Sequence, residues 1–327
     1  MTPLLRLGSL TGALLCLFAR PVLADLQLGG AKVHFASASE GSQTLKSRDD
    51  FIQRLSPFDR SARMKVARVV TEDEYLAFVE TNVTDWSPGQ IEVVSKAIGA
   101  LRPQVSAFSL SLPATIQLIQ TTGSEEGGAA YTRGAAIILT KDELAKDEAT
   151  LQRLIAHELF HVLSRHNPQL REKLYRVIGF EKCNEIELPP ELQRRKITNP
   201  DAPRNDHFIR VRIDGSECFA VPILLSSAET YDTKRGGEFF AYLQFQFLVV
   251  EKNAGSQIFK PAYEGSSAKL VEPKRVSGFM EQIGRNTEYV IHPEEVLADN
   301  FALLVLKKSN VASPEILQKL REVLAQK

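Results

Sequence analysis

The chain has 327 residues, of which 43% are hydrophobic and 24% are charged, and its 40 basic and 40 acidic residues balance. This length and apolar content suffice for one large or two small domains with a buried core. The balanced charge excludes a strongly basic nucleic-acid-binding protein, so we expect no nucleic acid partner. No segment beyond the N-terminal region is long and apolar enough to cross a bilayer, so we expect no integral membrane segment in the mature chain.

The first 24 residues have the pattern of a secretory signal peptide. Arg6 precedes an apolar stretch, Leu7 to Phe18, that is too short to span a bilayer comfortably, and Val22-Leu23-Ala24 offers the small residues that signal peptidase accepts. We therefore predict cleavage near Ala24 and a mature protein that is periplasmic or secreted. The alternative is an uncleaved membrane anchor, because Arg20-Pro21 interrupts the usual cleavage region.

The two cysteines that remain after this cleavage are Cys183 and Cys218. An even number of cysteines in an exported protein predicts a disulfide bond. A bridge closing a loop of about 35 residues would stabilise the fold by roughly 3 to 4 kcal/mol. The alternative is two free, buried thiols.

Residues 25–47 are rich in Gly, Ser and Ala and carry little periodicity, which indicates an arm or a linker. We expect residues 48–327 to form one domain that begins with a helical N-terminal portion. Capping patterns predict three helices there: 49–55, 71–80 with the capping box Thr71 and Glu74, and 87–100 with Ser87 as cap.

Two strands are predicted at 114–120 and 135–140, separated by the glycine-rich stretch 123–128, and we expect them to pair. A capping box at Thr140 and Glu143 then precedes a long helix at about 148–165, which ends at Asn167-Pro168. This order indicates a small mixed or antiparallel sheet packed on the long helix.

The second half of the chain alternates in character. We predict a further helix at 169–179 and a proline-rich polar loop at 181–206. Three strands at 208–213, 218–225 and 239–250 follow, then a Gly/Ser/Lys-rich stretch at 252–278 and two final helices at 293–308 and 314–325. The fold class is therefore α+β, with a loop and β-rich insertion at about 181–278.

The long helix carries the sequence His157-Glu158-Leu159-Phe160-His161. Histidines four residues apart lie on one face of a helix, so both imidazoles can reach one Zn²⁺. Glu158, one residue after the first histidine, can take a proton from a water that the metal activates. The alternative is a structural helix that carries this pattern by chance, but unpaired imidazoles on its buried side would be costly.

Zinc in a catalytic site normally has three protein ligands, so two histidines leave one to be found. Downstream, Glu295 and Asp299 are four residues apart on a predicted helix, so that one can bind zinc and the other can accept the free N–H of a ligating histidine. Glu294 is the rival ligand. The Glu-x-x-x-Asp register favours Glu295, and Glu294, turned by about 100°, is then expected to touch neither the metal nor its ligands.

With these residues the sequence resembles the gluzincin zinc metallopeptidases, in which His-Glu-x-x-His is completed by a glutamate from a second helix and an acid four residues on. The resemblance implies a zincin-like core in which His157, His161 and Glu295 bind one zinc ion per chain. It also implies that Glu158 is the general base and that Asp299 is the outer partner of an imidazole. The gap of 134 residues between the second histidine and the glutamate is long for the thermolysin type, and the β-rich insertion explains it.

The same resemblance makes strand 135–140 the edge against which an extended peptide or protein substrate would pair; an ordinary core strand is the alternative. Four residues are candidates for stabilising the oxyanion: His207, Tyr231, Tyr289 and His292. We prefer Tyr289 and His292 because they are close in sequence to Glu295.

These features predict an exported zinc metallopeptidase that hydrolyses peptide bonds through a water activated by Glu158. The first alternative is a zinc-binding but non-proteolytic envelope or extracellular binding protein with a vestigial site. The second is a scaffold without metal. The presence of Glu158 argues against the first alternative, and the complete ligand set argues against the second.

Overall fold

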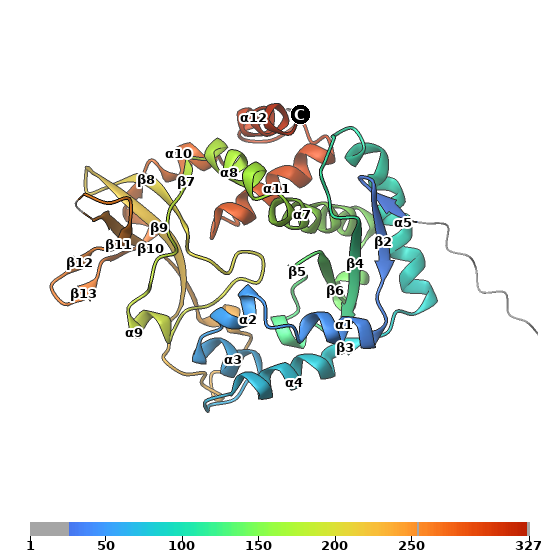
Figure 1. Cartoon of the computed structure of the whole chain (residues 1–327), viewed down its shortest axis with the longest axis horizontal. Coiled ribbons are helices and arrows are strands. Elements are labelled where there is room, and N and C mark those ends of the chain that lie inside the picture. The colour runs from blue at the N-terminus through green and yellow to red at the C-terminus, as the bar shows by residue number, and fades with distance from the viewer. Residues whose placement is uncertain (1–25, 254, 326–327) are drawn as a thin grey trace, which may run out of the picture.

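The computed structural model describes residues 26–253 and 255–325, and the predicted signal peptide with its cleavage site lies outside them. Within these ranges the fold is α+β, as predicted, with twelve α-helices, a mixed six-stranded sheet and an antiparallel seven-stranded sheet (Figure 1). A small hairpin, β12 (Tyr263–Glu264) and β13 (Ser267–Ala268), stands beside the larger sheet. None of the described helices has the length and apolar character needed to span a bilayer.

The mixed sheet has the strand order β1–β2–β4–β6–β5, with β3 paired to β4. Its strands are β1 (Gln27–Leu28), β2 (Ala31–Phe35), β3 (Val83–Thr84), β4 (Thr115–Thr121), β5 (Tyr131–Arg133) and β6 (Ala136–Thr140). β4 and β6 pair in parallel, so the predicted pairing of these two strands is confirmed. Within the segment 25–47, expected as an ordered arm or a linker, residues 27–45 form β1, β2 and helix α1 (Ala38–Leu45), and Leu28, Ala31 and Val33 are buried in the core.

The edge of this sheet is β5, since β6 lies between β4 and β5. The prediction that strand 135–140 forms the edge is therefore wrong. The reason is the tight turn at Gly134, whose φ of +58° is a backbone conformation that glycine adopts at little cost. This turn folds residues 131–133 back against β6, so that a short strand missed in the sequence covers it.

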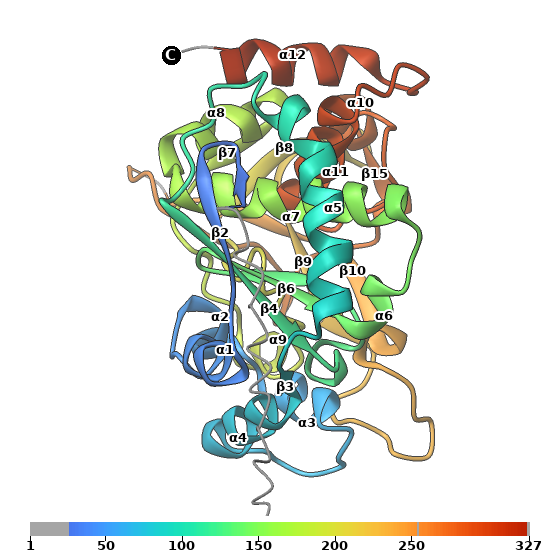
Figure 2. The same cartoon turned by 90° about the vertical axis from the view of Figure 1, so that its right-hand side faces the viewer.

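Helix α7 (Glu148–His166) lies between the mixed sheet and helix α11 (Pro293–Val305), and it also packs on α5 (Pro88–Val105). Figure 2 shows α5 running across the front of this assembly. Asp147 begins α7 by accepting the backbone N–H of Thr150 at 3.0 Å. Leu159 of α7 and Phe301 of α11 belong to one buried core cluster together with side chains of β4 and β6. Helix α7 is thus packed against the mixed sheet, α5 and α11.

Further helices cover the other face of the mixed sheet and extend the core. Their bounds are α2 (Asp50–Arg54), α3 (Pro57–Arg63), α4 (Glu72–Asn82), α6 (Lys141–Leu144), α8 (Pro168–Val177), α9 (Pro190–Gln193), α10 (Phe279–Ile283) and α12 (Pro314–Ala325). Helix α3, which the sequence prediction missed, begins with a capping box of Ser56 and Asp59. The capping boxes predicted for α4 and α5 are present.

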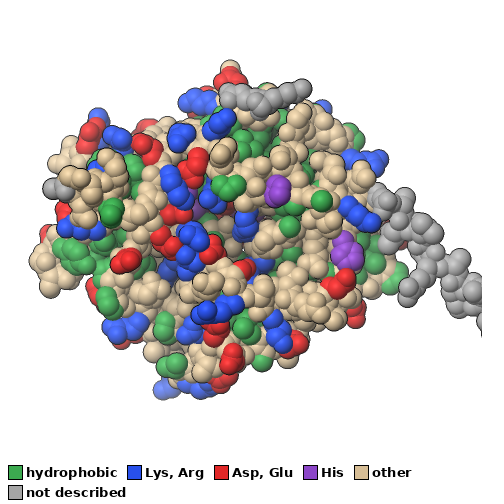
Figure 3. Space-filling view, in the orientation of Figure 1, with side chains coloured by type: hydrophobic (Ala, Val, Ile, Leu, Met, Phe, Trp, Pro, Cys, Tyr) green, Lys and Arg blue, Asp and Glu red, His purple; other side chains and the backbone are tan. Residues whose placement is uncertain are grey.

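The antiparallel sheet lies between α8 and α10 in the chain and has the order β11–β10–β9–β8–β15, with β7 paired to β8 and β14 to β10. Its strands are β7 (Phe180–Lys182), β8 (His207–Ile213), β9 (Ser216–Ser226), β10 (Leu243–Lys252), β11 (Phe259–Pro261), β14 (Leu270–Val271) and β15 (Val276–Ser277). In Figure 1 it stands on the opposite side of the molecule from the mixed sheet. Figure 3 shows that basic and acidic side chains are interspersed over the face of the molecule that is seen in Figure 1.

Cys183 and Cys218 are both free, so the predicted disulfide bond is wrong. Strand β8 separates the two cysteines. The backbone N–H of Cys183 donates to Asp206 just before β8, whereas Cys218 pairs with Val211 on the other side of that strand. Five residues along the strand and two strand spacings amount to about 19 Å, far beyond the roughly 4.4 to 6.8 Å between Cα atoms that a disulfide allows.

Candidate metal centre

The site is formed where α11 crosses α7. His157 and His161 lie one turn apart on α7, and α11 presents three acids to them: Glu294, Glu295 and Asp299. Helix α11 begins at this point because Pro293 occupies its first turn and His292 caps it, with the imidazole Nδ1 accepting the Glu294 N–H at 3.1 Å. The acids therefore lie in the first two turns of α11.

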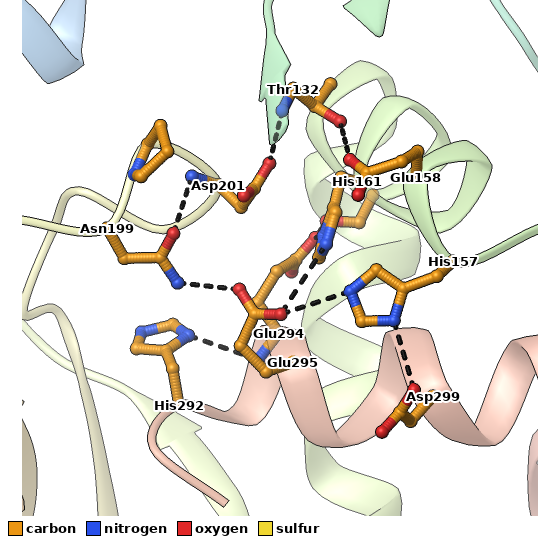
Figure 4. A network of polar contacts seen from close by, with 12 residues as sticks. Thr132, His157, Glu158, His161, Asn199, Asp201, His292, Glu294, Glu295 and Asp299 are labelled. Carbon is orange, nitrogen blue, oxygen red and sulfur yellow. Dashed lines mark hydrogen bonds and ion pairs between the residues drawn. The ribbon is translucent and has the colours of Figure 1, made fainter. Parts of the chain in front are cut away.

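His157, His161 and Glu295 bring three donor atoms together, all within 4.8 Å of one another (Figure 4). The Glu295 Oε2 atom lies 3.2 Å from His157 Nε2 and 3.7 Å from His161 Nε2. The His161 side chain is fully buried, yet its Nε2 atom has no hydrogen-bond partner. A buried nitrogen without a partner is costly unless something else binds it. Two imidazoles and one carboxylate are a donor set that zinc accepts, so the residues present fit this ion.

Each imidazole also has an acid on its other nitrogen. His157 Nδ1 lies 3.2 Å from Asp299 Oδ1, and Asp299 in turn contacts Arg153 at 3.2 Å and accepts the hydroxyl of Thr287. His161 Nδ1 lies 3.1 Å from Glu294 Oε1. A carboxylate in this position fixes the tautomer and the orientation of an imidazole that binds a metal.

The expectation that Glu294 touches no ligand is thus wrong. Its carboxylate contacts His161 and also accepts the hydroxyls of Ser164 at 2.6 Å and Tyr175 at 2.5 Å. The physical reason is the crossing of the helices. Because α11 crosses α7, the neighbouring residues Glu294 and Glu295 both face α7, on different sides of the His161 ring.

Glu158 is buried and lies toward the edge strand. Its Oε2 atom accepts the Thr132 hydroxyl at 2.7 Å, while the backbone N–H of Thr132 donates to Asp201 Oδ1 at 2.7 Å. Glu158, His161 and Asp201 form a second group of possible ligands within 4.8 Å of one another. Asn199 joins the two groups, since its amide donates to Glu295 Oε1 at 2.6 Å and its oxygen accepts the Asp201 N–H at 2.9 Å.

Sequence reasoning missed Thr132, Asn199 and Asp201. The latter two belong to the segment predicted as the proline-rich loop 181–206, and an Asn-Pro-Asp sequence is common in turns. Nothing in the local sequence signals that this loop returns to α7, so no pattern could have identified these residues.

The electrostatics of the site favour a cation. Burial opposes a charge on both imidazoles, but Asp299 and Glu295 raise the pKa of His157 well above its usual value. Asp201 and Glu295 likewise outweigh burial and raise the pKa of His161 to about 9. The two imidazoles in return lower the pKa of Glu295 to about 2 against the effect of burial. The carboxylates thus create a negative potential between the histidines, which a bound metal cation would neutralise.

The two residues expected to stabilise an oxyanion are placed differently. His292 is engaged as the helix cap, and burial lowers its pKa to about 4. The Tyr289 side chain is 43% exposed as a whole, but burial of its hydroxyl end raises its pKa, and the carboxylates of Glu295, Asp201 and Glu158 add to this effect. Tyr289 lines a small pocket together with Asn199 and Asp201. His207 and Tyr231 are engaged elsewhere, with Asp206 and with the Gly237 carbonyl respectively.

Residues 120–169 match the family model of the eCIS core domain, a metallopeptidase-like domain of extracellular contractile injection systems. The matched segment runs from the end of β4 through β5, β6 and α7, and it contains His157, Glu158 and His161. It does not extend to α11, which carries Glu295. No curated protein and no solved structure matches the chain.

Proposed function

We propose that this protein is an exported zinc-dependent peptidase in which His157, His161 and Glu295 hold the metal. The observation that carries the proposal is the buried, unpartnered His161 Nε2, 3.7 Å from Glu295 Oε2 and beside a second imidazole. When bound, zinc would act as a Lewis acid and lower the pKa of a water molecule. The match of residues 120–169 to a metallopeptidase-like domain supports the same reading.

Glu158 is the proton carrier in this proposal. Its carboxylate lies one residue from His157 and beside His161, so it can accept a proton from a water at the centre and pass it to the leaving amine. The Thr132 hydroxyl donates to Glu158 Oε2, which leaves Oε1 for that proton. In this proposal Tyr289, which lines a pocket with Asn199 and Asp201, supplies a hydroxyl donor for the oxyanion.

In this mechanism an extended peptide would bind along strand β5. Its far side does not pair with another strand of the described sheet, and Thr132 connects it to Glu158. Main-chain pairing with such an edge binds peptides without demanding a particular side chain. The substrate class proposed is therefore an extended polypeptide.

The test combines metal analysis with peptide cleavage by the mature chain. We expect about one zinc per chain, and loss of zinc in the double variant His157→Ala, His161→Ala. His166→Ala, which removes an exposed histidine from the same helix, is the matched control and should keep its zinc. Full zinc occupancy in the double variant would show that the site is elsewhere.

Glu158→Gln separates binding from catalysis. The amide has a similar shape but cannot accept the proton, so zinc should stay while cleavage of a mixed peptide library falls by at least about 10²-fold. Glu148→Gln, at the exposed start of the same helix, should cleave at the parental rate. Equal rates for Glu158→Gln and the parent would exclude Glu158 as the base.

The location of the protein is part of the proposal and has its own test. Sequencing the N-terminus of protein recovered from the periplasm or the medium should give Asp25 as the first residue. A chain that retains Met1 and sediments with membranes would favour the uncleaved anchor.

A further inference from the structure

The segment Asn199–Asp201 lies along the open side of strand β5. The Arg165 guanidinium on α7 donates to four backbone carbonyls: its Nη1 atom binds that of Gly134 at 3.1 Å, and its Nη2 atom binds the other three. Its Nη2 atom lies 3.4 Å from the carbonyl oxygen of Thr132, 3.3 Å from that of Pro200 and 3.2 Å from that of Asp201. Arg165 therefore holds the segment against the edge strand.

Both main-chain groups of Thr132 are already engaged in this arrangement. Thr132 pairs with Ile137 across the hairpin, and its N–H and C=O point away from β6, where they contact Asp201 and Arg165. In an antiparallel ladder these outward groups are the ones a further strand would use. A peptide that pairs with β5 would thus need the place that Asn199–Asp201 occupies.

The same segment reaches the metal centre. The Asp201 carboxylate lies within 4.8 Å of the donor atoms of both Glu158 and His161, while Asn199 binds Glu295 at 2.6 Å (Figure 4). Pro200 and Asp201 also line two hollows, a cavity of about 610 Å³ toward Arg133 and His292, and a pocket of about 40 Å³ toward Tyr131 and Tyr289. The segment stands between the two hollows.

We infer that Asp201 is a further metal-binding residue and that Asn199–Asp201 occupies the substrate position, so that the described conformation is a closed, resting form. The inference rests on the proposed function of the same centre. A carboxylate oxygen of Asp201, within 4.8 Å of donor atoms of His161 and Glu158, would take the place of the water that the reaction needs. Displacing the segment frees that position and the outward groups of Thr132 in one movement, and it joins the two hollows into one groove.

Asp201→Asn is the decisive variant, because its amide oxygen can still accept the Thr132 N–H while the negative charge is lost. We would measure the zinc affinity by chelator competition at fixed pH and the visible spectrum of the cobalt(II)-substituted protein. Zinc Kd should rise about tenfold or more, since even the outer partner of a ligand changes affinity by about 10- to 100-fold. The cobalt spectrum should change, because the ligand set changes.

Cleavage per bound zinc should rise in the same variant by at least about threefold, because the closed form is weakened while the reaction groups stay. Asp85→Asn is the matched control. This carboxylate also accepts a backbone N–H, that of Ala38 at 2.7 Å, but it follows β3 and belongs to neither group of possible ligands. It should match the parent in all three measurements.

The outcomes separate the two claims from each other and from the proposed function. Unchanged zinc affinity and cobalt spectrum in Asp201→Asn would show that Asp201 is not a ligand. An unchanged or lower rate per bound zinc would show that the segment does not cover the substrate position. Retention of zinc by the double variant His157→Ala, His161→Ala would instead refute the metal centre itself, whatever Asp201 does.

Discussion

The carboxylate of Glu294 bonds to His161 Nδ1 at 3.1 Å, on the opposite side of the ring from the nitrogen that faces Glu295. Two neighbouring residues of α11 thus hold one imidazole from both sides. Their substitutions should have different effects, because one acid would bind the metal and the other orients a ligand.

We expect Glu295→Ala to weaken zinc binding the most, and Glu294→Ala and Asp299→Ala to weaken it by about 10- to 100-fold each. Glu294→Gln should lose less than Glu294→Ala, because its amide oxygen can still accept from the imidazole. Chelator titration of the four variants at one pH decides the order. An affinity of Glu294→Ala equal to that of the parent would contradict the role of this contact.

Removal of zinc should destabilise the fold. Without the cation, only the protonated imidazoles balance the buried carboxylates of Glu294 and Glu295 on α11. Free zinc at 1,000 times its Kd would stabilise the folded state by about 4 kcal/mol. Scanning calorimetry with zinc and with a chelator should show a lower Tm in chelator for the parent and for His166→Ala. A His161→Ala variant with the same zinc response as the parent would refute this coupling.

A second set of charges, outside the metal centre, predicts a pH-dependent contribution to stability. Asp206 is buried, and although burial opposes its charge, His207 at 2.6 Å and Lys182 at 2.5 Å lower its pKa well below the usual value. A carboxyl whose folded-state pKa is depressed stabilises the fold above its unfolded pKa of about 3.9 and loses that effect as the pH falls toward the folded value.

Asp206→Asn should therefore lower the free energy of unfolding by roughly 2 kcal/mol at pH 7, which is typical of hydrogen bonds to a charged group. The difference from the parent should shrink as the pH falls below about 4. Urea titrations across this range measure it, with the exposed Asp232→Asn as control. A difference that stays constant with pH would mean that the ionised carboxylate is not the stabilising species.

Both cysteines should be alkylated in protein that is denatured without reductant, because neither is bridged. In the native protein Cys183 should react slowly, since burial raises the pKa of its thiol to about 12 and keeps it protonated. Mass spectrometry of the alkylated peptides measures both. Detection of a peptide that joins Cys183 to Cys218 would contradict the arrangement of strands around β8.

Local signals predicted the helices well and the sheet edge poorly. Thr71 and Ser87 each cap the helix that follows them, as predicted, because a cap depends on residues three or four positions away. The short strand β5 carries only three residues and no alternating pattern, so no local signal indicated that it would cover β6. Its existence depends on the turn at Gly134 and on packing against α7.

The metal centre likewise has some relationships that local sequence patterns predict and others that they do not. The spacing of His157 and His161 places both on one face of α7, and the structure brings Glu295 and Asp299 of α11 to them. The contact of Glu294 with His161 depends on the crossing of two helices, and the approach of Asp201 depends on the path of a loop through space. Neither relationship can be inferred from the spacing of residues along the chain.

The long interval between the two halves of the centre has a consequence for how the protein is made. His157 and Glu295 are separated by 138 positions, and the whole antiparallel sheet lies between them. At about 5 to 20 residues per second, the ribosome finishes the histidines on the order of ten seconds before the glutamate. A nascent chain during that interval offers two imidazoles without their third partner. The metal centre can form only after the C-terminal helices have been synthesised and docked, so a chain truncated before α11 lacks Glu295 and cannot complete the site.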